Sequence, residues 1–400
     1  MKRTIGAARI LAVAGAALGA LLLGAIFTGV SVPLFHLPTP TGAFAVGTIV
    51  STLAGTGVQI WYPAVSPSGR TAPYRFALPP RRLRDRFYGT FVRTDAALGA
   101  PVAPGRHPAL VYIPSWGGVR SDNTTQAENL ASHGYVVVAI DDLYPDKAMD
   151  LSTAVAYRDT LRWAARKVRL EAAVALRVLS ALESGAGDAG TRFAGRLDRH
   201  RAGVFGFSFG GAVAAEAATL DPRIRAAVNL DGWIFGAAAN NGVPRPYLMA
   251  SSSAADDLAA RTAEHVDHTF SDRLDRDNSK QIEDGFARYG GYDLTVTGVE
   301  HYNFSDVGVL PSLRHTGVGP LEGRRASAIV AAYVLQFFDR YVCDRPAPLF
   351  DELTAPGADR SRISLDPAAR LEIRHPRKSA QSNHRAQRSA ARFDRLRNAA

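Results

Sequence analysis

The chain has 400 residues, a formal net charge of +10 and a single cysteine, Cys343, which excludes an internal disulfide and is expected to be a buried thiol. Lys2, Arg3 and Arg9 contribute +3, and residues 358–400 contribute +7 from eleven basic and four acidic side chains, which leaves the body of the chain near neutral. Proteins that bind nucleic acid carry their basic residues on a folded face, so this distribution argues against a nucleic-acid partner.

An apolar run without charge extends over residues 10–35, directly after the basic residues. A membrane span needs about 20 such residues, whereas the core of a cleaved signal needs about 7–15. The length favours an uncleaved signal-anchor over residues 1–36, whose positive charge keeps that end in the cytoplasm. The rest of the chain is therefore expected to be membrane-anchored outside the cytoplasm, or secreted if the segment is cut at Ala43-Phe44-Ala45.

The segments that follow alternate between short apolar strands and helices. Strands are expected at 47–50, 57–63, 109–113, 135–140, 202–207, 224–230, 246–250 and 292–299. Helices are expected at 123–133, 151–182, 211–220 and 325–342, with the arginines between Arg158 and Arg177 on an exposed face. Continuous apolar strands separated by helices predict an α/β fold, in which a mostly parallel central sheet carries helices on both faces.

The same pattern divides the chain into three parts. Residues 1–36 form the N-terminal segment, residues 37–356 one domain, and residues 357–400 a basic tail with the composition of disorder. The polar stretch 251–291 interrupts the alternation and is expected to form an insertion or a cap over one edge of the sheet. It contains His265 and His268, but their spacing matches no zinc site, and no metal or other cofactor is expected.

Residues 204–211 carry the strongest chemical signal. A β-branched and aromatic run ends in Gly206-x-Ser208-x-Gly210 and passes directly into a run of small residues that predicts a helix. In this context the glycines remove Cβ atoms where strand and helix crowd together, and the turn presents the serine hydroxyl as a nucleophile. The pattern alone also fits an ordinary glycine-rich turn, and the residues on either side of it favour the nucleophile.

A serine nucleophile needs a base, and a carboxylate that orients the base. After a turn of this kind the acid and the histidine come later in the chain, each at the end of a strand. Asp231 and His301 hold these positions, and Asp257 or Asp256, after the next strand, is the alternative acid. No other histidine combines this order with a strand-end position.

The negative oxygen that forms during serine attack needs two backbone N–H donors. The first is expected from Phe209, which directly follows the serine at the start of a helix. The second is expected from the glycine-rich loop of residues 115–118, where Trp116 is the choice and Gly117 the alternative. The Trp116 ring also fits a role in the core or as a wall of an acyl pocket.

Several of these motifs resemble the platelet-activating factor acetylhydrolase family (plasma type, isoform II) of α/β hydrolases. The segments concerned are residues 38–42, 46–48, 130–137, 195–211, 230–233 and 301–306, and the resemblance spans roughly residues 38–350. It implies the α/β-hydrolase fold, a triad of Ser208, Asp231 and His301, and an acid at Asp231 rather than Asp257. Phe207 stands where the family commonly has histidine, and Ser115 where it usually has histidine or glycine.

The sequence therefore predicts a serine esterase that works through an acyl-enzyme. The resemblance implies short-acyl phospholipids or related small-molecule esters as substrates, which a membrane anchor would suit. Two alternatives remain. One is a hydrolase of another acyl bond, such as an amidase or a polyester hydrolase, and the other is a catalytically silent binding protein on the same fold.

Overall fold

The computed structural model describes residues 34–67, 69–74, 89, 91–144, 149–185, 187–252, 269–310, 317–354 and 364–376, with five further positions between 13 and 20. The expected signal-anchor, residues 1–36, lies almost wholly outside these ranges and stays a prediction. Within the part of the chain that is described, no helix is long and apolar enough to cross a membrane.

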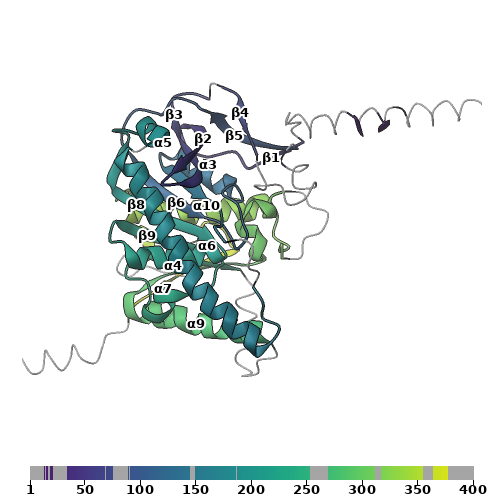
Figure 1. Cartoon of the computed structure of the whole chain (residues 1–400), viewed down its shortest axis with the longest axis vertical. Helices are drawn as coiled ribbons and strands as arrows, with labels where there is room; N and C mark the ends of the chain where they lie inside the picture. Colours follow the sequence, from purple (N-terminus) through teal and green to yellow (C-terminus); the bar gives the residue numbers. More distant parts are fainter. Residues whose placement is uncertain are drawn as a thin grey trace, which may run out of the picture.

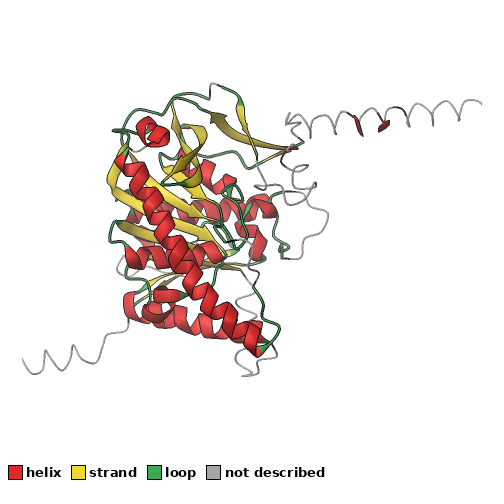
Figure 2. Ribbon diagram, viewed as in Figure 1, coloured by secondary structure: helices red, strands yellow, loops and turns green. Residues whose placement is uncertain are grey.

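A twelve-stranded mixed sheet forms the centre of the molecule (Figures 1 and 2). Its strands are β1 (Phe35–His36), β2 (Ala45–Leu53), β3 (Thr56–Ala64), β4 (Thr71–Pro73), β5 (Val92–Leu98), β6 (His107–Ile113), β7 (Val136–Ile140), β8 (Leu197–Phe207), β9 (Ile224–Leu230), β10 (Tyr247–Ser252), β11 (Gly291–Val296) and β12 (Ala369–Arg374). They lie in the order β1-β5-β2-β3-β7-β6-β8-β9-β10-β11-β12, with β4 beside β5. From β7 to β11 every neighbouring pair is parallel, so the carboxyl ends of these strands meet at one edge.

The helices cover both faces of this sheet. They are α3 (Thr124–Ser132), α4 (Ala154–Ser184), α5 (Gly187–Arg192), α6 (Phe209–Leu220), α7 (Gly236–Asn241), α9 (Phe270–Tyr289), α10 (Gly323–Tyr341) and α11 (Pro348–Thr354), with short 3-10 helices at His301–Phe304 and Asp306–Gly308. Helices α4, α5, α6, α7 and α9 pack on one face, and α3, α10 and α11 on the other (Figure 2). The predicted α/β fold with helices on both faces is therefore confirmed.

Strand β7 shows why an uninterrupted apolar run suits the centre of this sheet. Successive side chains point to opposite faces, so Val136, Val138 and Ile140 enter the core under α4 and α6. Val137 and Ala139 enter the core under α3 and α10. Because both faces are covered, no position along the strand is available to a polar side chain, and all five residues are fully buried.

The C-terminal boundary predicted at residue 356 is too early. Residues 369–374 form β12, which pairs antiparallel with β11 at the edge of the sheet, so the expectation of disorder is wrong for this segment. Its sequence alternates between charged and apolar residues, and Leu371 is buried while Arg370 and Arg374 are exposed. This period of two is that of a half-buried edge strand, and the high overall charge of the tail concealed it.

The described part of the stretch 251–291 is the end of β10 followed by α9. The apolar side of α9 enters the core through Leu274 and Phe286. Residues 253–268, between β10 and α9, lie outside the described residues. They include Asp257, His265 and His268, and the predictions made for these residues stay predictions.

Candidate active site

Ser208 occupies a sharp turn between β8 and α6. Its backbone has φ 57° and ψ −124°, a conformation that costs a residue with a Cβ atom on the order of 1–3 kcal/mol. Two backbone hydrogen bonds hold the turn, from Ser208 N–H to Leu230 O at 2.8 Å and from Gly211 N–H to Ser208 O at 2.9 Å. Ser208 is partly exposed at this turn, whereas Phe207 and Phe209 on either side of it are buried.

The glycines around Ser208 are required by close backbone contacts. A Cβ atom at Gly206 would lie 2.1 Å from Gly210 O, and one at Gly210 would lie 2.1 Å from Ile113 O. The first contact joins the end of β8 to the start of α6, and the second joins α6 to β6. The Gly-x-Ser-x-Gly pattern thus reflects the approach of helix to sheet that the sequence predicted.

His301 lies between Ser208 and Asp231. The Nε2 atom of its ring is 3.0 Å from Ser208 Oγ, and the Nδ1 atom is 2.7 Å from Asp231 Oδ2. With the ring proton on Nδ1, the histidine donates to the carboxylate and accepts from the serine hydroxyl. The side chain of His301 is 38% exposed and that of Asp231 only 14%, so the base is accessible while the acid is shielded.

Asp231 is held in place independently of His301. It follows β9 with a positive φ of 55°, and its N–H donates to Ala250 O at 2.7 Å. The N–H of Ser252 donates to Asp231 Oδ1 at 2.7 Å, which leaves Oδ2 to face the imidazole. Both carboxylate oxygens therefore have a fixed partner, and the carboxylate is oriented before any substrate binds.

A buried asparagine that sequence reasoning missed supports this turn. Asn229 accepts a hydrogen bond from Gly232 N–H at 2.8 Å and donates to Gly232 O at 2.9 Å. Tyr247 OH lies 3.0 Å from the same amide nitrogen. Asn229 is fully buried. A polar residue among the apolar residues of β9 was the sequence signal from which its supporting role could have been found.

The loop that carries His301 is anchored to the start of α3. Asp306 accepts hydrogen bonds from the N–H groups of Thr124 at 2.8 Å and Thr125 at 3.0 Å, and Asn123 donates to Phe304 O at 2.9 Å. Burial raises the pKa of Asp306 to about 6, although the hydrogen bonds from Thr124 and Thr125 lower it. The segment 301–306 is thus held to a helix far away in the sequence.

The first expected oxyanion donor directly follows Ser208 in the chain. Phe209 is the first residue of α6, and the N–H groups of the first helical turn have no partner within the helix. Trp116 lies in the glycine-rich loop after β6, with its ring 4.8 Å from the Phe209 ring. The N–H of Gly117 donates instead to the carboxylate of Asp142, which argues against the alternative donor.

Aromatic side chains pack against His301 in the hydrogen-bonded chain. The Phe207 ring packs on the His301 ring at 4.8 Å, and Tyr302 next to it is 42% exposed. Trp233, two residues after Asp231, is half-buried, and its Nε1–H donates to Asp275 of α9 at 2.7 Å. Aromatic rings thus pack next to the base of the candidate triad, and such rings suit contact with apolar or aromatic groups.

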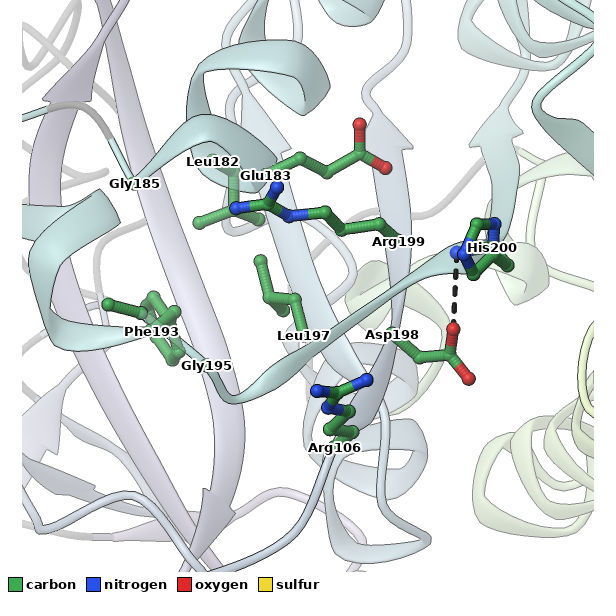
Figure 3. Close-up of a pocket in the computed structure, with 11 residues that line it drawn as sticks. Arg106, Leu182, Glu183, Gly185, Phe193, Gly195, Leu197, Asp198, Arg199 and His200 are labelled. Atoms are coloured by element: carbon green, nitrogen blue, oxygen red, sulfur yellow. Dashed lines mark hydrogen bonds between the residues drawn. The ribbon is translucent and has the colours of Figure 1, made fainter.

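A cavity of about 300 Å³ lies elsewhere, where β8 begins (Figure 3). It is lined by residues at and just after the α4 C-terminus, of the turn after α5, and of the start of β8, among them Glu183, Phe193, Leu197 and Arg199. Ser208 follows the opposite end of β8. None of the predicted site residues lines this cavity, so it is not part of the candidate site.

Comparisons with known proteins agree with the fold. A family model described as PETase, PET hydrolase-like, matches residues 100–290. Platelet-activating factor acetylhydrolase of Cavia porcellus is 24% identical over 298 residues, which cover 65% of this chain and 63% of that protein, less than two thirds of its length. The structure of a ferulic acid esterase from Streptomyces cinnamoneus aligns with a TM-score of 0.61 and 25% identity, over 84% of this chain and 99% of that one.

The two comparison proteins and the family model have names that describe ester hydrolases, and the structural alignment covers nearly the whole esterase. The family model includes both Ser208 and Asp231 within its matched range. The resemblance predicted from the motifs is therefore confirmed. The chain therefore has the fold of the α/β hydrolases and is a distant homologue of platelet-activating factor acetylhydrolase, and its residues 100–290 match the PET-hydrolase-like family model.

Proposed function

We propose that the protein is a serine carboxylic-ester hydrolase in which Ser208, His301 and Asp231 act together. The observation that supports this proposal is the continuous hydrogen-bonded chain, 3.0 Å from Ser208 Oγ to His301 and 2.7 Å from His301 to Asp231. A serine hydroxyl becomes a nucleophile when a base accepts its proton and a carboxylate stabilises the charged base. Strain at both Ser208 and Asp231 also supports a functional role, because unfavourable backbone conformations concentrate at such sites.

In the first half of the reaction, Ser208 Oγ attacks the carbonyl carbon of the ester while His301 Nε2 accepts the hydroxyl proton. The N–H groups of Phe209 and Trp116 bind the negative oxygen, and each such donor contributes about 3 kcal/mol. The intermediate then collapses, the bond to the alcohol oxygen breaks, and the alcohol leaves with the proton from His301. Water, deprotonated by the same histidine, attacks the acyl-enzyme and releases the acid.

Short-acyl esters are the proposed substrates, on a lipid or another apolar alcohol. The rings of Phe207 and Tyr302 pack against His301, and the Trp116 ring packs against Phe209, so aromatic side chains near the triad offer contact area to apolar groups. The named activity of the acetylhydrolase relative supports a short acyl group. An aromatic or polymeric ester is the second candidate, which the exposed Tyr302 ring and the names of the ferulic acid esterase and the PET hydrolase family favour.

We also propose that residues 1–36 anchor the chain in a membrane, with the hydrolase domain outside the cytoplasm. The apolar run of residues 10–35 is long enough for a span of about 20 residues, and basic residues precede it. An anchored enzyme would meet lipid esters in the surface on which it sits.

The decisive experiment is hydrolysis of p-nitrophenyl acetate and butyrate by the full-length protein and its Ser208→Ala variant. Ser184→Ala is a matched control, because Ser184 is an exposed serine on α4 whose hydroxyl donates to Ala181 O of the same helix at 2.9 Å. Activity that disappears in Ser208→Ala and persists in Ser184→Ala would support the proposal. Folded wild-type protein that neither hydrolyses esters nor reacts with a fluorophosphonate probe would favour a binding protein instead.

A further inference from the structure

Three buried charged side chains lie beneath the glycine-rich loop of residues 115–118. Lys167 and Glu171 are one turn apart on α4, and Asp142 follows β7. The Lys167 side chain is fully buried, and those of Asp142 and Glu171 are 2% exposed. Lys167 Nζ donates to both carboxylates, at 2.5 Å to Glu171 Oε1 and at a closer distance to Asp142 Oδ1. A lysine at complete burial is rare and needs such partners.

Asp142 connects this cluster to the glycine-rich loop. Its carboxylate accepts a hydrogen bond from Gly117 N–H, and its own N–H donates to Gly118 O at 3.2 Å. It also accepts from Tyr144 N–H at 2.8 Å. Gly117 is the neighbour of Trp116, so the Asp142 carboxylate fixes the peptide next to the expected oxyanion donor.

Lys167 also touches both residues that supply the expected oxyanion donors. Its Nζ atom lies 5.2 Å from the Trp116 ring centroid and 5.2 Å from the Phe209 ring centroid. A cation within about 6 Å of a ring face is attracted by it. One buried ammonium group therefore connects α4 to the glycine-rich loop and to the first residue of α6.

The balance of charge in the cluster depends on one proton. Burial raises the pKa of Glu171 to about 8, although the Lys167 charge opposes it. Burial also raises the pKa of Asp142, but hydrogen bonds from Glu171, Lys167 and the backbone outweigh it and lower the pKa overall. At neutral pH the cluster thus holds one anionic Asp142 between the Lys167 ammonium group and a protonated Glu171 that donates to it.

We propose that Asp142 is a positioning residue for the oxyanion hole, and that Lys167 and Glu171 hold its carboxylate against Gly117. The inference rests on the proposed function, and it adds a reason for activity to fall in alkaline solution. When Glu171 loses its proton, a second buried anion competes with Asp142 for Lys167, and the hydrogen bond to Gly117 weakens. The other groups that face the cluster are the Tyr144 ring, 5.6 Å from Lys167 Nζ, and the rings of Trp116 and Phe209. On α6, Glu216 pairs with Arg169 of α4 at 3.6 Å.

The first test compares kcat and KM of full-length wild type and Asp142→Asn on p-nitrophenyl butyrate. We expect kcat to fall about 10²-fold while KM changes less than about threefold, because a displaced oxyanion donor weakens only transition-state binding. The matched control is Glu183→Gln. Glu183 is a buried acid on the same helix, paired with Arg223 at 2.7 Å, and it lines the distant cavity (Figure 3). The Glu183→Gln variant should retain the kcat of wild type.

The second test is the pH profile of kcat for Glu171→Gln, which keeps the neutral form of the side chain at every pH. Wild type and Glu183→Gln should lose activity as pH rises through about 8, whereas Glu171→Gln should not. If Asp142→Asn does not fold, this profile decides alone.

The outcomes separate this inference from the proposed function. A wild-type enzyme that depends on Ser208, combined with wild-type kcat in Asp142→Asn, would overturn the positioning role alone. An alkaline decline that persists in Glu171→Gln would overturn the role of its proton. A wild-type protein that hydrolyses no ester would refute the proposed function, and the positioning role would fall with it.

Discussion

Replacing Asp231 by asparagine changes one atom in the acid of the candidate triad and tests its role directly. In the native arrangement Asp231 Oδ1 accepts from Ser252 N–H at 2.7 Å, and Oδ2 faces His301 Nδ1 at 2.7 Å. An asparagine oxygen must take the place of Oδ1, since an amide NH₂ there would meet the N–H of Ser252. The NH₂ group of the variant therefore faces His301 Nδ1.

This orientation selects the wrong form of the histidine. An NH₂ group donates, so Nδ1 must accept, and the ring proton moves to Nε2, the atom 3.0 Å from Ser208 Oγ. A protonated Nε2 cannot take the proton of the serine hydroxyl. In other triads the same change lowers kcat about 10⁴-fold, which corresponds to about 5.5 kcal/mol of lost transition-state stabilisation. We expect a loss of this size in kcat on p-nitrophenyl butyrate.

The assay needs Asp257→Asn as a comparison, because the sequence alone leaves both acids open. Asp231→Asn should also unfold at a temperature close to that of wild type, since volume and both neighbouring N–H contacts are retained. A decrease in kcat of less than tenfold in Asp231→Asn, together with a loss of several orders of magnitude in Asp257→Asn, would refute the assignment of Asp231.

Three further outcomes follow from the structure. In Gly232→Ala the new Cβ would lie 1.9 Å from Ser208 O, so we expect about 1–3 kcal/mol lower stability in urea unfolding and reduced kcat; wild-type values would contradict the close contact. The raised pKa of Asp306, about 6 against 3.8, means that its contribution to stability is complete below about pH 4. About 3 kcal/mol of this contribution is lost as pH rises through about 6, and Asp306→Asn should lack this decrease across a pH series of unfolding curves. Removal of residues 1–36 should leave protein that is active on water-soluble esters; a folded but inactive truncate would show that this segment does more than anchor.

The elements that the sequence predicted well have local signals. Strand β9 has the predicted bounds, 224–230, because a mostly apolar run ends at an aspartate. The turn at Ser208 was also predicted, since the glycines that permit it are two residues away on either side. The exposed face of α4 is confirmed as well: Arg158, Arg162 and Arg177 are exposed, as their spacing between apolar residues indicated.

The acid could not be identified in this way. Asp231 and Asp257 both follow apolar strands in the expected order, and nothing local to either residue distinguishes them. The distance from Asp231 to His301 is fixed by the pairing of β9 with β10 and of β10 with β11. Such pairings join segments about 70 residues apart in the chain, and only the resemblance to a known family favoured one acid over the other.

The buried cluster on α4 shows where a sequence pattern was informative but incomplete. Lys167 lies three residues after Ala164 and next to Val168, within the stripe of α4 that faces the sheet. That spacing predicts burial, and a buried ammonium group requires an anionic partner. Glu171, one turn later, is a partner that the sequence can name. Asp142 is 25 residues away and reaches Lys167 only because the connection from β7 to α4 returns the helix across the sheet. A charged residue in an apolar stripe therefore points to a network, and the fold determines which loop that network holds.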